Sequence, residues 1–294
     1  MLLAQVALVS ETNQITAAQL SRVTAALQKQ VTRDFGPLWN VSATVDAFER
    51  LEDVPVGYWP VIVADDIHEP AGVDGIHLDE HGQPFALVQY SDSWSLTASH
   101  EILEMLADPA GNRLMAGHSP KPDQGVVEFL VEVADPPEDP QFGYTVNGFL
   151  VSDFITPHFY DPVTADGVRY SFGGNIKEPR SIREGGYISW LDRTTNLWWQ
   201  QVWFGTSKPV FRKLGRMTNR SGSIRSAIDA KTETARRIAQ AGPQSLKFAD
   251  ARTLTAQIKE TTASRAQGWR DQIEALKAGK IVEAMWEGGE EENG

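Results

Sequence analysis

Hydrophobic and polar residues alternate with recognisable periods through the first ninety positions. Apolar runs of six or seven residues predict strands, and apolar residues spaced three and four apart after Thr16 predict an amphipathic helix. The predicted elements are strands at 3–9, 43–49 and 59–64, a helix from Thr16 to just before Phe35, and a hairpin over 74–90 with its turn at 81–84.

The next segments continue this alternation up to about position 205. Residues 94–107 have helical spacing and stop before Pro109, and residues 126–134 form a clear alternating strand that runs into Asp135. Further strands are predicted at 144–152, at 168–172 and within 186–204, where residues 193–196 form a turn. This mixture of strands and helices predicts an α+β domain over residues 1–211.

The pattern changes from about position 213. Strand signals disappear, helical spacing takes over, and Gly242-Pro243 divides the remaining chain into two helical pieces. Apolar positions are sparse in these helices, so they cannot bury much surface by themselves. We therefore predict that residues 212–294 form a helical tail that associates with a protein partner, with another copy of the chain or with the body of the protein.

Charge and composition narrow the classes of function. The formal net charge is −12, and it divides into −16 for residues 1–211 and +4 for residues 212–294. An acidic body disfavours a nucleic-acid binder, whose surface would be positive. The absence of cysteine excludes disulfides, thiolate metal sites and cysteine nucleophiles. No apolar run reaches the length of a transmembrane helix and no signal peptide is recognisable, so we expect a cytoplasmic protein without membrane contact.

The helix predicted at 94–107 contains the sequence SHEILEMLADP, which begins with His100 and Glu101. Residues four apart lie on one helix face, so His100 and Glu104 project together and can hold one cation, while Glu101 flanks them. Asp108 continues the polar face. The alternative is an ordinary amphipathic helix with a solvated polar face, since such short patterns are common by chance.

The strand predicted at 126–134 supplies a second acidic set. Glu132 stands between Leu130 and Ala134 on one face of that strand, and Asp135 follows its end. A carboxylate placed in the middle of a domain needs a partner because an unpaired buried charge is costly. A divalent cation shared with the helix would supply that partner.

These motifs resemble the zincin-type metallopeptidases, in which a helix, a twisted sheet with an edge hairpin and an active-site helix beginning His-Glu follow one another. More narrowly, SHEILEMLADP, LVEVADPPE and VSDFITPHFYD are similar to a family of uncharacterised bacterial and phage-associated proteins. The resemblance covers residues 1–205. It implies a zincin-like twisted mixed sheet and does not extend to the tail. The sparse apolar positions of the tail and the lack of an export signal suggest a component of an assembly, which could be phage-like.

Carried over residue by residue, the zincin pattern makes His100 a metal ligand and Glu101 the general base. Glu104 stands where the second histidine of that pattern would be, and Glu132 or Asp135 would supply the third ligand. Zinc is the first expectation for the metal, with manganese or calcium as alternatives, because a carboxylate-rich site selects zinc less strongly. Any hydrolysis should then be slower than at a two-histidine site.

Several other residues are weaker candidates for contact with the metal or substrate. His77 lies on the predicted edge hairpin, where an exposed histidine without a role is the simpler interpretation. Asp153 could reach the site or cap a turn, and Tyr187 could donate to a developing oxyanion or pack in the core. The basic stretch Arg212–Arg237 could bind phosphate or an acidic partner, or form a solvated helix face.

Two hypotheses for the function follow. In the first, the chain is a metal-dependent peptidase or related hydrolase with a variant HExxE site, and its substrate is a peptide or protein. In the second, the zincin-like domain is catalytically inactive, and the protein is a structural or assembly module that binds partners through its C-terminal helices. A metal site is common to both.

Overall fold

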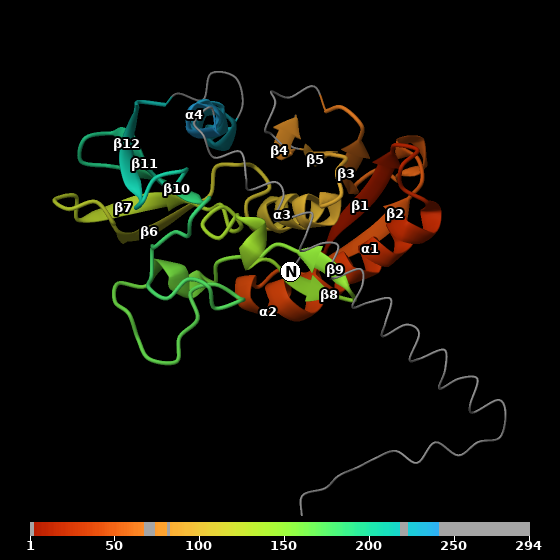
Figure 1. The fold of residues 1–294 in the computed structure, drawn as a ribbon, viewed down its shortest axis with the longest axis horizontal. Coiled ribbons are helices and arrows are strands. Elements are labelled where there is room, and N and C mark those ends of the chain that lie inside the picture. The colour runs from red at the N-terminus through yellow and green to blue at the C-terminus, as the bar shows by residue number, and fades with distance from the viewer. Residues whose placement is uncertain (1–2, 68–73, 81–82, 218–222, 241–294) are drawn as a thin grey trace, which may run out of the picture.

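A computed structural model describes residues 3–67, 74–80, 83–217 and 223–240. Two five-stranded sheets, called here sheet A and sheet B, stand side by side (Figure 1), and the helix α3, Trp94–Ala107, lies between them in the chain and in space. The mixed α+β architecture predicted from the sequence is confirmed at this level. One apolar core runs through both halves of the protein and includes the inner face of α3.

Sheet A has the strand order β2-β1-β3-β5-β4. Its strands are parallel to their neighbours except for β4, which pairs antiparallel with β5 as a hairpin and forms one edge. The bounds are Ala4–Glu11 for β1, Ala43–Phe48 for β2, Trp59–Ala64 for β3, Gly75–Glu80 for β4 and Gln83–Gln89 for β5. The four predicted segments of this sheet are therefore confirmed, although the turn residues 81–82 lie outside the described residues.

The first helical segment begins as predicted but continues further. The side chain of Thr16 caps α1, Ala17–Lys29, by accepting a hydrogen bond from the amide of Gln19. The helix then widens into a π-helical segment, η1 at Gln30–Phe35, and is followed by α2 at Gly36–Trp39, so the predicted end before Phe35 was wrong. Proline is compatible with the first turn of a helix, which explains why Pro37 lies in the first turn of α2 instead of ending the segment.

Sheet B has the order β12-β11-β10-β7-β6 with antiparallel pairing throughout. The bounds are Leu114–His118 for β6, Val126–Leu130 for β7, Tyr187–Asp192 for β10, Leu197–Val202 for β11 and Val210–Gly215 for β12. The β10–β11 hairpin confirms the predicted turn at 193–196. Strand β7 ends four residues earlier than predicted, and β6 was not predicted.

The strands of the second half differ from the expected pattern at three places. Residues 144–152 form a small hairpin of β8, Tyr144–Val146, and β9, Phe149–Val151, and not one strand. The predicted strand at 168–172 is reduced to a single bridge between Ile155 and Ser171. Position 212, where the domain boundary was expected, lies inside β12, so strand structure continues beyond it.

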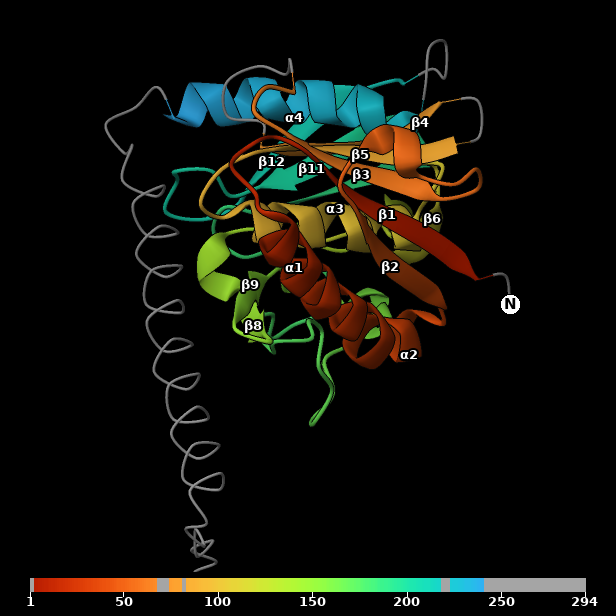
Figure 2. The same cartoon turned by 90° about the vertical axis from the view of Figure 1, so that its right-hand side faces the viewer.

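The helix α4, Ile224–Gln240, is the helical part of the predicted tail that the structure describes. Figure 1 shows it end-on between β12 of sheet B and β4 of sheet A, and Figure 2 shows it lengthwise across the same side of the molecule. Its Ile228 is fully buried with Leu130, Leu191, Trp198 and Leu214 of sheet B. The second predicted helical piece lies outside the described residues.

Within the described parts, none of the helices has the length and apolar character needed to cross a bilayer.

Candidate metal centre

Helix α3 carries three ionisable side chains into the interior. Glu101 and Glu104 are 4% and 0% exposed, and the side chain of His100 is 12% exposed. The solvated polar face considered as an alternative for this helix is therefore wrong. Directly before His100 in the chain, Ser99 ties the helix to its surroundings: its hydroxyl donates to Gln30 Oε1 at 2.7 Å and accepts from the amide of Ser152 at 2.9 Å.

Asp135 reaches this cluster from the segment that follows β7. The chain leaves sheet B after Leu130, and residues 131–135 are all buried. The amide of Tyr187 donates to the Asp135 carbonyl at 3.2 Å, which holds this segment beside β10. As a result, Asp135 Oδ1 lies 3.1 Å from His100 Nε2, and Glu104 Oε1 lies 3.4 Å from the same nitrogen.

His77 faces the opposite oxygen of Glu104. Its Nδ1 lies 3.7 Å from Glu104 Oε2 and 3.6 Å from Glu101 Oε2. The residue is 2% exposed, and neither ring nitrogen has a hydrogen-bond partner among the described residues. The exposed edge-strand histidine that the sequence favoured is thus wrong, and Glu104 stands between two histidine-containing sets: His77 with Glu101, and His100 with Asp135.

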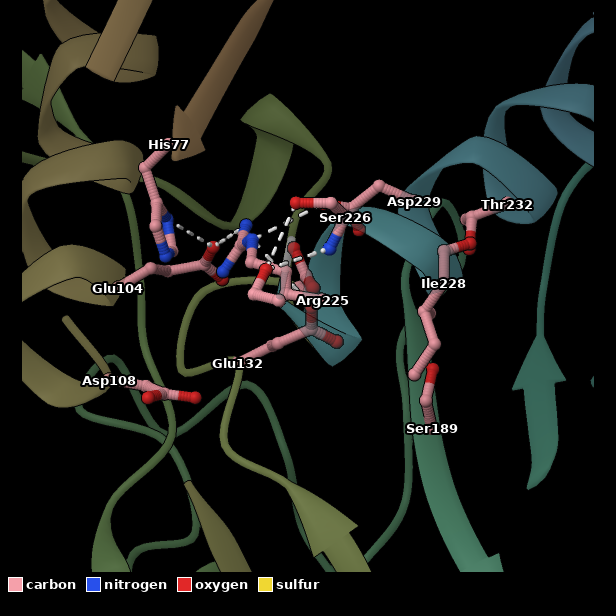
Figure 3. A network of polar contacts seen from close by, with 12 residues as sticks. His77, Glu104, Asp108, Glu132, Ser189, Arg225, Ser226, Ile228, Asp229 and Thr232 are labelled. Carbon is pink, nitrogen blue, oxygen red and sulfur yellow. Dashed lines mark hydrogen bonds and ion pairs between the residues drawn. The ribbon is translucent and has the colours of Figure 1, made fainter. Parts of the chain in front are cut away.

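Arg225 of α4 enters the same cluster from the other side. Its guanidinium Nη2 donates to Glu104 Oε2, and its Nε lies 3.3 Å from Asp229 Oδ2 and 3.8 Å from Glu132 Oε1. Figure 3 shows the guanidinium reaching from α4 toward Glu104, with Glu132 and Asp229 around it. The arginine is 4% exposed, so this is a buried ion pair and not a surface contact.

The electrostatics of the cluster favour charge on His100 and Glu104. Burial alone would lower the pKa of His100, but the facing carboxylates of Glu104 and Asp135 outweigh it and raise that pKa well above the usual value. Burial likewise opposes ionisation of Glu104, yet Arg225 and His100 hold its pKa well below the usual range. The pKa of His77 is lowered by burial and by the charge of Arg225, so His77 is a neutral imidazole.

The other two glutamates tend to keep their protons. Burial raises the pKa of Glu101 to about 8, although His100 and Arg225 act in the opposite direction. Burial, followed by the nearby charge of Asp135, also raises the pKa of Glu132 well above its usual value. Protons thus compensate for an excess of buried carboxylates, which is the condition under which a bound cation would be favoured.

The donor set and its spacing fit a divalent metal ion. Two ligand atoms bound at ordinary distances by one tetrahedral ion lie about 3.4 Å apart. The distances from His100 Nε2 to Glu104 and Asp135 match that spacing, and those from His77 Nδ1 are only slightly longer. Several buried atoms of the cluster also lack hydrogen bonds: both nitrogens of His77, Glu101 Oε2, both carboxylate oxygens of Glu132, and Asp135 Oδ2.

The other residues predicted for the site have different places. Glu132 lies beside Arg225 and belongs to neither histidine-containing set. Asp108 accepts the amide of Arg113 at 2.7 Å just after α3, and Asp153 accepts the amides of Phe154 and Gly173, which makes it a turn-anchoring residue. Tyr187 donates from its hydroxyl to Asp229 Oδ1 at 3.4 Å, at the rim of the cluster.

Arg225 and Asp229 are the main site residues that the sequence did not identify. The two residues are four positions apart on α4. An ordinary ion pair on a solvated helix surface has the same spacing, so the sequence did not mark them as site residues. Tyr160 was missed as well; it is buried, and burial and the charge of Glu132 raise its pKa far above the usual value.

No known protein family, curated protein or solved structure matches this chain.

Proposed function

We propose that this chain is a metal-dependent hydrolase with a zincin-like fold that acts on amide bonds of peptides or proteins. His100, Glu104 and Asp135 would hold the metal, with zinc as the first candidate and manganese or calcium as alternatives. The observation that carries the proposal is the position of His100 Nε2, 3.1 Å from Asp135 Oδ1 and 3.4 Å from Glu104 Oε1.

The order of elements supports the same proposal. The antiparallel edge strand β4 of sheet A pairs with β5 as a hairpin, and the helix whose polar face begins with His100 and Glu101 follows this hairpin in the chain. His77 on that edge strand faces the helix residues Glu101 and Glu104. An edge hairpin followed by a His-Glu helix is what the zincin resemblance leads us to expect.

The metal ion and Glu101 have separate roles in the proposed hydrolysis. A divalent ion held by His100, Glu104 and Asp135 would supply a Lewis acid that polarises a carbonyl and acidifies water. Glu101, offset from the His100–Glu104 pair, would accept a proton from the attacking water, and burial raises its pKa to about 8, the direction that makes a carboxylate a stronger base. Burial of the site excludes bulk water from this exchange.

A second candidate function is favoured by Arg225. A guanidinium bonded to Glu104 already provides one cation to the cluster, as would be expected in a catalytically inactive module whose acidic centre is structural. This candidate is an assembly component that binds protein partners through its C-terminal helices, and the assembly could be phage-related.

Metal binding is the first test of the proposed hydrolase. Zinc titrated into the metal-free wild-type protein by calorimetry should bind with a stoichiometry of about one at the highest-affinity site. His100→Ala should lose that binding, while His118→Ala, which removes an exposed histidine of β6 outside the cluster, should retain it. Absence of zinc, manganese and calcium binding to both the wild-type protein and Arg225→Met, which removes the guanidinium from Glu104, would rule out the metal-dependent proposal.

A further inference from the structure

The start of α4 is fixed to the loop that follows α3. The amide of Ile224 donates to Asn112 Oδ1 at 2.9 Å, and the amide of Arg225 donates to the carbonyl of Gly111 at 3.0 Å. Gly111 has a positive φ of 60°, and a side chain there would meet Ser223 and Arg225 at close range. These contacts determine where Arg225 enters the cluster.

The next turns of α4 bind sheet B. Ile228 packs into the apolar cluster of that sheet, and the hydroxyl of Thr232 accepts a hydrogen bond from Gln200 Nε2 at 2.7 Å. Arg212 of β12 donates to the carbonyl of Lys231 at 3.2 Å. The helix is thus attached along one face over about two turns, with Arg225 at the end nearest to the candidate metal centre (Figure 3).

Arg225 shares Glu104 with the candidate metal. The guanidinium contacts Oε2, and the metal-binding set of His100 and Asp135 faces Oε1 of the same carboxylate. A divalent ion and a guanidinium bound to one buried carboxylate repel each other strongly, because little solvent screens them. The two cations therefore oppose each other at Glu104.

The hydrogen bonding of Arg225 distinguishes this contact from an optimised structural anchor. A buried arginine that only stabilises the fold is expected to have its donors satisfied. Here Nε and Nη1 are buried without a hydrogen-bond partner among the described residues, although Nε is close to two carboxylates. The guanidinium contributes its charge to the cluster while much of its hydrogen-bonding capacity is unused.

We infer that Arg225 is a built-in cationic competitor of the metal ion, so that metal loading and release of α4 from the site are coupled. The inference rests on the proposed metal-dependent function and concerns the regulation of the same site. With α4 docked, the centre is closed and its negative charge is partly compensated. When metal binds, the favourable electrostatic energy between Arg225 and Glu104 decreases. The docked helix is then held mainly by Ile228 and its neighbours. Coupling of this kind is reciprocal between the two events.

Zinc affinity of full-length variants tests the inference. Arg225→Met should bind zinc at least about fivefold more tightly than wild type, within the usual range for coupled sites. Lys213→Met removes the same charge from an exposed position on β12 and should leave the affinity unchanged. Equal affinities in wild type and Arg225→Met would overturn the inference but not the proposed function, whereas absence of zinc binding in all three proteins would overturn both.

Hydrogen exchange in the wild-type protein gives a second test that needs no substitution. Amides 226–232 of α4 should exchange about fivefold faster or more when zinc is saturating, while amides in the core strand β1 keep their rates. Unchanged or slower exchange in α4 with zinc bound would overturn the inference. This measurement also decides the question if Arg225→Met fails to fold, as judged by circular dichroism.

Discussion

His100 of α3 and Asp135 after β7 place Nε2 and Oδ1 only 3.1 Å apart, although they belong to different halves of the protein. Glu132, the other acidic residue considered for this role, lies instead beside Arg225. The two carboxylates, three positions apart in the chain, therefore have separate functions in the proposed site. Asp135 would be a metal ligand, and Glu132 faces α4.

Substitution of these two acids should have unequal effects on metal binding. Asp135→Asn should weaken zinc binding by at least about tenfold, because it removes a charged ligand next to His100. Glu132→Gln should change the affinity by less than about threefold, since Glu132 lies beside Arg225 and belongs to neither histidine-containing set. Calorimetric titration of both variants makes the comparison, and an equal loss in both would place Glu132 among the ligands.

Glu101→Gln should retain the metal and lose turnover. The glutamine has the same size but cannot accept a proton, and a general base contributes about 10²- to 10⁴-fold to a rate. Zinc content is measured on the purified variant, and cleavage is measured with a peptide library. The assay should be run in the Arg225→Met background as well as in wild type, because a docked α4 would keep wild type slow.

The controls separate the two candidate functions. If Arg225→Met cleaves peptides with zinc and the double variant carrying Glu101→Gln does not, the hydrolase is supported. If Arg225→Met binds zinc and cleaves nothing, the catalytically inactive module is the better description of this protein.

Ser99→Ala should destabilise the fold without removing the metal ligands. The substitution leaves Gln30 Oε1 and the amide of Ser152 without their partner in a fully buried location. Loss of buried hydrogen bonds of this kind costs about 1–3 kcal/mol. Thermal unfolding of metal-free protein should show a correspondingly lower midpoint, and Ser95→Ala, which loses a single bond to the carbonyl of Leu150 in a half-buried position, should cost less.

The helix α3 was predictable because local information determines it. The apolar spacing over 94–107 and the pairing of His100 with Glu104 at a distance of four follow from helix geometry alone. Strands β1 to β5 were predictable for the same reason, since their apolar runs are short and bounded by polar turns. The edge strand β12, with Arg212 and Lys213 in its sequence, lacks that signal because only part of it is buried.

The remaining site residues depend on contacts that no local pattern encodes. The alternation from Val126 to Ala134 suggested one long strand, but the chain leaves the sheet after Leu130, and this decides which acid reaches His100. Arg225 resembles the neighbouring basic residues of the tail in the sequence. Its burial follows from the acids of α3 and the β7 segment, more than ninety positions earlier, so spacing along α4 could not reveal it.

Gly186 should be required for the position of Asp135. A β-carbon at this residue would lie 2.5 Å from the Asp135 carbonyl oxygen and 2.4 Å from that of Pro136, which is closer than backbone atoms allow. Gly186→Ala should therefore displace the segment that carries Asp135, lower the zinc affinity and cost about 1–3 kcal/mol of stability. Gly167→Ala is the matched control, because φ there is 77° but a β-carbon would meet nothing within 4 Å. That control should show backbone strain without loss of zinc binding, and an unaltered zinc affinity in Gly186→Ala would contradict the role assigned to Asp135.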